Sequence, residues 1–158
     1  MMHTETERKF LVKNDSYKAS ATKAYRICQG YIAHDGGNTV RVRIRDDKGF
    51  LTIKGPSATG LSRSEWEMEI PVMDAEALME LCLGGKIDKT RYLVPEQGGL
   101  LCFEVDEFHG DNEGLTEAEI ELPDPEAAFT KPDWLGEEVT GDKRYYNSHL
   151  TVRPFKKW

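Results

Sequence analysis

Charged residues recur at every second position in two short stretches of the first third of the chain. The first stretch holds Glu5, Glu7 and Lys9, and the second, residues 41–45, reads Arg-Val-Arg-Ile-Arg. Successive side chains of a β-strand point to opposite faces, so each set occupies one face of its strand. Arginine and lysine bind phosphate oxygens, and carboxylates hold hard divalent cations. The two rows therefore predict a site that binds an anion and a cation together.

The same alternation recurs later in the chain, with the two signs of charge kept on separate strands. Lys89 and Arg91 form a basic pair, whereas Glu119 and Glu121 form an acidic pair. Like charges at neighbouring positions of one face repel each other, and an exposed sheet face usually mixes the signs. A solvated polar face would explain any one of these strands. It does not explain the separation by sign, which favours a ligand-binding face.

The composition limits the classes of protein to which the chain can belong. Its 158 residues suit one domain, spanning residues 1–158, with a substantial core. The net charge of −7 argues against a nucleic-acid polymer as partner. No apolar run is long enough to cross a membrane, and the start of the chain does not resemble a signal peptide. We therefore expect a cytoplasmic protein that acts on a small molecule.

Alternating apolar runs, separated by Gly, Asp, Asn and Pro, predict about eight antiparallel strands. Asp74 is expected to cap a helix that ends at Gly84-Gly85. Two more helices are expected in the tail, one from Pro125 to a break at Pro132 and one over 142–150. The fold class is α+β, with the sheet curled into a barrel. The expected strands lie near Thr4–Val12, Ala24–His34, Thr39–Asp46, Gly49–Gly55, Ser64–Pro71, Ile87–Val94, Leu100–His109 and Leu115–Leu122.

The ordered series of charged residues resembles the signature of the CYTH domains, also called triphosphate tunnel metalloenzymes. The resemblance extends from Glu5 to about Asn147, and the compact length is similar to that of the small bacterial members. It implies an eight-stranded antiparallel barrel with helices packed on the outside. Its tunnel would bind a triphosphate with Mg²⁺ or Mn²⁺. The matching motifs are Glu5-x-Glu7-x-Lys9, Arg41-x-Arg43, Lys54, Arg63-x-Glu65-x-Glu67, Lys89-x-Arg91 and Ala118-Glu119-x-Glu121.

The resemblance also implies roles for individual residues. Glu65 would join the substrate site, where it and Glu67 help to bind a second ion or orient water. Arg45 matches less securely, because it lies nearer the end of its strand. The basic residues that would grip the triphosphate are Lys9, Arg41, Arg43, Lys54, Lys89 and Arg91, all but Arg43 also being expected to act in catalysis. The carboxylates that would hold metal are Glu5, Glu7, Glu67, Glu119 and Glu121.

Several other residues have the correct parity or position, but a structural role explains them equally well. Glu69, Glu104 and Asp106 could serve as partners for basic neighbours. Tyr31 and either Lys143 or Arg144 could approach the tunnel, although the structural interpretation is favoured for them.

The pattern of charged residues favours an enzyme that hydrolyses a linear triphosphate, with inorganic tripolyphosphate as the preferred substrate. The same scaffold is compatible with a class IV-type adenylyl cyclase, a thiamine triphosphatase or a nucleoside triphosphatase. A non-catalytic polyphosphate- or nucleotide-binding protein is the alternative from another class. The presence of the acidic set favours catalysis over mere binding. A homodimer is compatible with the sequence, but nothing in the sequence requires one.

Overall fold

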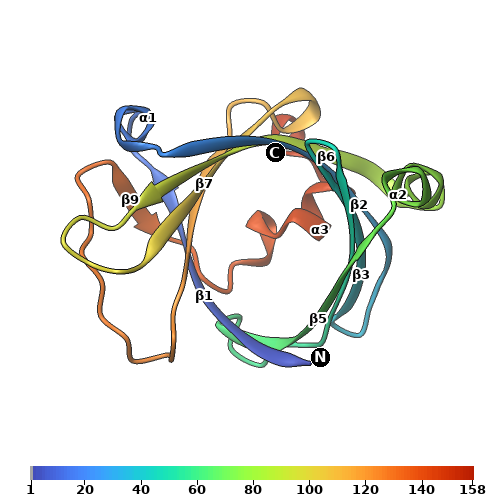
Figure 1. Ribbon diagram of the computed structural model, residues 1–158, viewed down its shortest axis with the longest axis horizontal. Coiled ribbons are helices and arrows are strands. Elements are labelled where there is room, and N and C mark those ends of the chain that lie inside the picture. Colours follow the sequence, from blue (N-terminus) through green and yellow to red (C-terminus); the bar gives the residue numbers. More distant parts are fainter. Residues whose placement is uncertain (1) are drawn as a thin grey trace.

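The computed structural model describes residues 2–158 and shows a closed antiparallel β-barrel (Figure 1). Pairing between the first and fifth strands closes the ring of eight, and a ninth short strand lies beside the first. The predicted eight-stranded barrel is confirmed. The strands are β1 (His3–Val12), β2 (Lys23–Asp35), β3 (Asn38–Arg45), β4 (Lys48–Lys54), β5 (Ser62–Ile70), β6 (Leu83–Pro95), β7 (Cys102–Phe108), β8 (Thr116–Glu121) and β9 (Leu135–Glu138).

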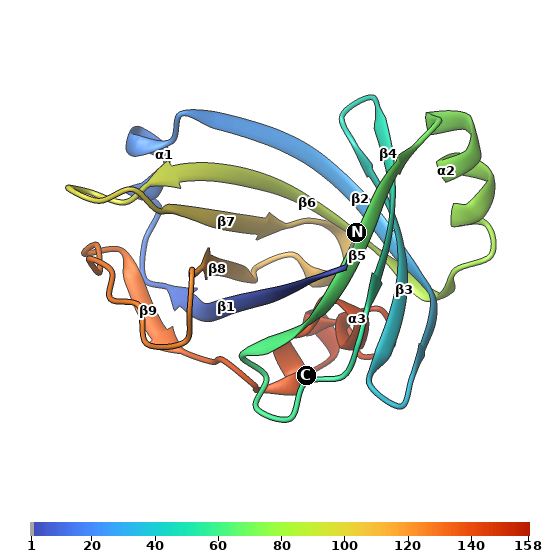
Figure 2. The ribbon, with the colours of Figure 1, turned by 60° about the horizontal axis from the view of Figure 1, so that its bottom comes forward.

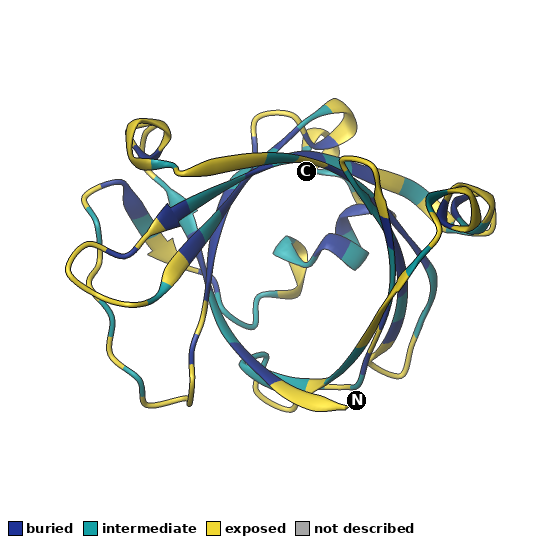
Figure 3. Ribbon diagram, in the orientation of Figure 1, coloured by how far each residue is buried: buried dark blue, intermediate teal, exposed yellow. Residues whose placement is uncertain are grey.

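Most apolar residues of the strands lie on the outside of the barrel, where two of the three hydrophobic clusters are found. One core is built around Phe10, Phe103 and Ile120, and Trp134 and Leu135 from the β9 region cover it. Figure 3 shows buried segments along most of the barrel wall, but none in β5, although the middle of the ring is open in the ribbon. The charged faces of the same strands consequently point inward, as strand parity requires.

Helices cover the outer wall at two places, as expected. The short α1 (Tyr17–Ser20) and the longer α2 (Val72–Met79) lie outside the ring (Figures 1 and 2). The other helices are α3 (Asn147–Leu150) and three 3₁₀ turns, η1 (Gly110–Asn112), η2 (Lys143–Tyr145) and η3 (Phe155–Lys157). Within residues 2–158 no helix combines the length and apolar character needed to span a membrane.

The α3 helix departs from the expected outer arrangement because it enters one end of the barrel. Its Leu150 packs against Ile87 and Phe108. Its Asn147 Oδ1 accepts a hydrogen bond from Lys89 Nζ at 2.7 Å and contacts Gln29 Nε2 at 3.3 Å. The tail of the chain therefore supplies part of the inner wall.

Two expectations about helices were wrong. Residues 125–134 form no helix. The chain continues into β9, which pairs with the carboxyl-terminal end of β1. Short-range pattern cannot show this pairing, because it depends on a strand far away in the sequence. The helix predicted to start at Asp74 begins after Pro71, so Asp74 lies in its first turn, and the helix ends before Gly84, which already belongs to β6.

Gly60 lies where the β4–β5 loop touches the tail of the chain, and this contact provides a test of the fold. Both Gly60 and Gly98 have a positive φ, 78° and 73°. An added Cβ at Gly60 would clash with the Cα of Gly141, whereas one at Gly98 would meet nothing within 4 Å. We expect Gly60→Ala to lower Tm by on the order of 5 °C more than the matched Gly98→Ala. Equal melting temperatures of the two variants would contradict this packing.

Candidate functional site

A charged cavity of about 630 Å³ runs through the barrel. Its walls combine basic side chains, mainly from β3, β4 and β6, with acidic ones, mainly from β1, β5 and β8. All of the site residues expected from the sequence line it, so strand parity placed each of them on the correct face. They are Glu5, Glu7, Lys9, Arg41, Arg43, Lys54, Glu65, Glu67, Lys89, Arg91, Glu119 and Glu121.

The arginine row on β3 is only partly neutralised by carboxylates. Arg41 donates to Thr52 Oγ1 at 3.1 Å and lies 3.5 Å from Glu67 Oε2. Arg43 donates to the neutral Gln29 Oε1 at 2.7 Å and has no carboxylate within 4 Å among the described residues. Loss of bulk water, followed by repulsion from Arg41 and Arg91, lowers the pKa of Arg43 to about 9. A guanidinium in this position is stabilised by an incoming anion.

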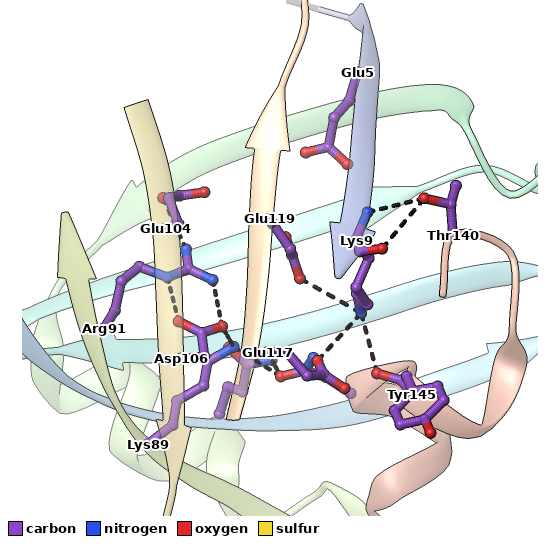
Figure 4. A network of polar contacts seen from close by, with 12 residues as sticks. Glu5, Lys9, Lys89, Arg91, Glu104, Asp106, Glu117, Glu119, Thr140 and Tyr145 are labelled. Atoms are coloured by element: carbon purple, nitrogen blue, oxygen red, sulfur yellow. Dashed lines mark hydrogen bonds and ion pairs between the residues drawn. The ribbon is translucent and has the colours of Figure 1, made fainter. Parts of the chain in front are cut away.

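Lys89 and Arg91 of β6 share a buried carboxylate on β7 (Figure 4). Asp106 accepts from Lys89 Nζ at 2.8 Å and from Arg91 Nε and Nη2 at 2.7 and 2.8 Å. Burial and repulsion from Arg91 and Arg43 lower the pKa of Lys89 to about 8, in spite of Asp106. Burial alone would raise the pKa of Asp106, but attraction by Arg91 and Lys89 outweighs it and keeps this carboxyl ionised. Asp106 is thus a structural partner for the basic pair.

Lys9 is held where β1, β8 and the tail of the chain meet (Figure 4). Its Nζ donates to the carbonyl of Tyr145 at 3.0 Å and lies 3.5 Å from Glu117 and 3.4 Å from Glu119. Burial lowers the pKa of Lys9, but the negative charges of Glu117, Glu119 and Glu7 outweigh burial and raise it above its ordinary value. Lys9 therefore stays protonated at any pH at which the protein would work.

Carboxylates gather on β1 and β8 with too few basic partners to neutralise all of them. Glu7 lies directly opposite Glu121, and no ion pair to either is found among the described residues. Burial and the negative charges of Glu119 and Glu5 raise the pKa of Glu7 well above its usual value. Burial, together with Glu5 and other carboxylates, also raises the pKa of Glu121. The pKa of the neighbouring Glu119 is instead held well below its usual range, because the positive charges of Lys9, Arg91 and Lys89 outweigh burial.

These carboxylates have the chemistry that a divalent cation needs. Mg²⁺ and Mn²⁺ prefer oxygen ligands, and a cation would offset the repulsion from Glu119 and Glu5 that helps to raise the pKa of Glu7. In residues 2–158 no three His, Cys, Asp or Glu side chains are already arranged as a metal site. Glu5 is bound to Lys54 at 2.8 Å, and Glu67 accepts from Thr52 at 2.7 Å on the other wall. The donor set fits a cation, and binding would require some of these ion pairs to rearrange.

Sequence reasoning missed three polar residues of the inner wall. Glu117 shares the parity of Glu119 and Glu121, so the alternation could have revealed it. Gln29 likewise follows the parity of Tyr31, to which it donates at 3.1 Å. Asn147 gave no such signal, because it reaches Lys89 from a helix 58 residues further along the chain.

The positions with uncertain roles are divided between the cavity and the surface. Tyr31, Arg45, Glu104 and Lys143 line the cavity. Arg144 instead pairs with Asp142 at 2.7 Å on the surface. His3 lies 3.2 Å from Glu65 at the start of β1.

The comparisons with known proteins agree with this geometry. The CYTH domain family matches residues 3–149. An inorganic triphosphatase from Acetivibrio thermocellus is 52% identical over 158 residues, covering 99% of each chain. One from Nitrosomonas europaea is 39% identical over 152 residues, which are 94% of this chain and 97% of the relative. A solved structure of an inorganic triphosphatase, 33% identical, covers 94% of this chain and 97% of its own with a TM-score of 0.67.

Glu117 provides a test of the electrostatics of the inner wall. It is fully buried, neither carboxyl oxygen has a hydrogen-bond partner, and burial raises its pKa to about 7 despite Lys9. Because this pKa exceeds the usual 4.5, ionisation destabilises the folded state. The cost appears as pH rises through 4.5 and is complete above about 7.

We therefore expect Glu117→Gln to raise Tm at pH about 8 by on the order of 5 °C, and to change it little near pH 4.5, where both side chains are neutral. Thermal denaturation at the two pH values measures the difference. A lower Tm of the variant at the higher pH would show that the pairing with Lys9 outweighs the cost of burial.

Proposed function

The chain belongs to the CYTH family, the triphosphate tunnel metalloenzymes, and on that premise we propose that it hydrolyses a linear triphosphate, most of all inorganic tripolyphosphate. The inorganic triphosphatases that it resembles align with nearly its whole length. The family implies a divalent metal cofactor, which we propose to be Mg²⁺ or Mn²⁺. We further propose that the enzyme acts in the cytoplasm.

The observation that carries the proposal is the uncompensated positive charge of the β3 row. Arg43 has a neutral amide as its partner, and its lowered pKa reflects both its position inside the barrel and the nearby Arg41 and Arg91. A protein seldom keeps an arginine in such a place unless an anion completes the site. Arginine forks match the geometry of phosphate oxygens. A triphosphate with a bound metal ion would satisfy both walls, because the arginines would bind the phosphate oxygens and the carboxylates would hold the metal.

The lining of the cavity supports an inorganic substrate over a nucleotide. Among the described residues, the aromatic side chains that line it are Tyr31, Tyr146 and His34. Tyr31 accepts a hydrogen bond from Gln29, its ring faces His34 edge-on, and the Tyr146 ring lies 5.5 Å below Lys9. Tyr31 is only 6% exposed and Lys9 covers one face of the Tyr146 ring, which leaves little aromatic surface for stacking a purine or thiazole.

Each wall has its own part in the reaction. The basic residues bind the triphosphate and neutralise charge on its equatorial and leaving oxygens as the anhydride bond opens. Lys9 suits the leaving phosphate, because its raised pKa keeps it cationic throughout the reaction. Glu5, Glu7, Glu119 and Glu121 would hold the metal, with Glu65 and Glu67 completing the site or orienting water. When bound, the metal would neutralise phosphate charge and lower the pKa of the attacking water.

The proposed function is tested by measuring products from tripolyphosphate, ATP and thiamine triphosphate with Mg²⁺, Mn²⁺ or a chelator. We expect metal-dependent phosphate release that is fastest from tripolyphosphate. Cyclic AMP and pyrophosphate from ATP would show a cyclase instead. Tight binding of tripolyphosphate without turnover in the presence of any metal would show that the protein binds polyphosphate but is not an enzyme.

Removing the guanidinium of Arg43 tests the role of the uncompensated charge. We expect Arg43→Gln to lower kcat/KM for tripolyphosphate by about 10²–10³-fold, the scale of losing one preorganised donor. The matched control is Arg144→Gln, which removes an exposed arginine that pairs with Asp142 and lies over the rings of Tyr145 and Trp158, outside the cavity. If both variants retain the parent's kcat/KM, Arg43 does not touch the substrate.

The pH dependence follows from the lowered pKa of Lys89. This lysine, with a pKa of about 8, loses its positive charge as pH rises, whereas the arginines of the cavity stay protonated. Since kcat/KM reports the free enzyme, it should fall from pH about 8 upward, and Lys89→Arg should move that fall to higher pH. A profile that stays flat to pH about 10 would contradict this assignment.

A further inference from the structure

Arg45 is the third arginine of the β3 row, and its surroundings differ from those of the other cations in the cavity. Its guanidinium lies between two aromatic rings, 4.9 Å from the centroid of Tyr25 and 4.8 Å from that of Phe50. It lines the same cavity as Arg41 and Arg43. Stacking on rings occupies the faces of a guanidinium and leaves the N–H donors around its edge available.

Those donors have no partner among the described residues. Arg41, Lys54, Lys89 and Arg91 each lie within 4 Å of a carboxylate, whereas no carboxylate lies that close to Arg45. Its side chain also makes no hydrogen bond, and Glu69, which lies beyond Phe50 across the sheet, forms no ion pair with it. The two rings fix the position of Arg45, and its charge remains free for a ligand.

The spacing of the row places Arg45 further along the tunnel than Arg41 and Arg43. Alternate residues of a strand are about 6.6 Å apart, so the Cα atoms of Arg41 and Arg45 are about 13 Å apart. Only four P–O bonds separate the terminal phosphorus atoms of a triphosphate. Phe50 lies opposite Arg43 on β4, and Tyr25 lies two residues before Ile27, the partner of Arg45 on β2, so the two rings contact the Arg45 guanidinium from the strands on either side of β3.

We propose that Arg45, clamped by Tyr25 and Phe50, forms an additional phosphoryl subsite at this end of the tunnel. The inference rests on the proposed function and extends it, because it adds a position that a triphosphate bound at Arg41 and Arg43 does not fill. Two sources could supply the phosphoryl group. One is the distal unit of a linear polyphosphate longer than three phosphates, and the other is free orthophosphate.

The test compares tripolyphosphate and tetrapolyphosphate as substrates, with orthophosphate as an inhibitor. The variants are Arg45→Gln, Phe50→Leu, which removes one side of the clamp, and the control Arg26→Gln. Arg26 lies next to Tyr25 on β2, but it is exposed and pairs with Asp88. Melting temperatures exclude misfolding as the cause of any loss.

If the subsite holds the distal unit, Arg45→Gln lowers the ratio of kcat/KM for tetrapolyphosphate to that for tripolyphosphate by about tenfold or more. If it holds orthophosphate, the ratio stays constant and the inhibition constant of orthophosphate rises by a similar factor. In either case Phe50→Leu produces a smaller change in the same quantity and Arg26→Gln produces none.

The proposal is overturned if Arg45→Gln changes neither the ratio nor the inhibition constant. Failure of the proposed function would look different, because the parent protein would then release no phosphate from tripolyphosphate. In that case calorimetric titration with tetrapolyphosphate still reads out the subsite. The parent should bind at least about tenfold more tightly than Arg45→Gln, and equal affinities would overturn the proposal.

Discussion

The structure depends on the balance of charge inside a closed sheet. Ionised side chains that leave bulk water are costly unless opposite charges or hydrogen bonds compensate them. The barrel provides compensation across neighbouring strands, as where Asp106 holds Lys89 and Arg91 and where Glu5 holds Lys54. Compensation is incomplete in two places, the arginines of β3 and the carboxylates of β1 and β8. The two excess charges have opposite signs. A bound polyanion would neutralise the arginines, and a bound metal ion would neutralise the carboxylates.

Filling the barrel with charge forces most apolar residues to the other side of the wall. Two hydrophobic clusters therefore form between the barrel and its outer layers, under α1 and β9 on one side and under α2 on the other, while a third closes the end of the barrel that α3 enters. Alternation along each strand satisfies both demands at once, because every second residue faces the outer layer. This division separates the residues that stabilise the fold from those that bind, with Lys9 and Phe10 as adjacent examples.

Most of the barrel and the lining of its cavity could be predicted from the sequence, because strand parity is a local property. Arg41 and Glu119 could be placed on the inner face by counting residues. The sequence could not show the contacts that β1 makes with the tail of the chain. The carbonyl of Tyr145 binds Lys9 across 136 residues, and β9 is a short strand that only its pairing with β1 defines. The incorrect helix after Pro125 has the same cause.

The position of β1 has a consequence for biosynthesis. This strand is made before all of its partners, β5, β8 and β9, and its lysine is anchored by Tyr145, which is made much later. While the chain is being translated, the strand must wait with its edges unpaired, and long-range pairing of this kind folds slowly. The charges on its inner face, Glu5, Glu7 and Lys9, discourage association with other nascent chains during that interval. The residues that later complete the site thus protect the strand before the barrel closes.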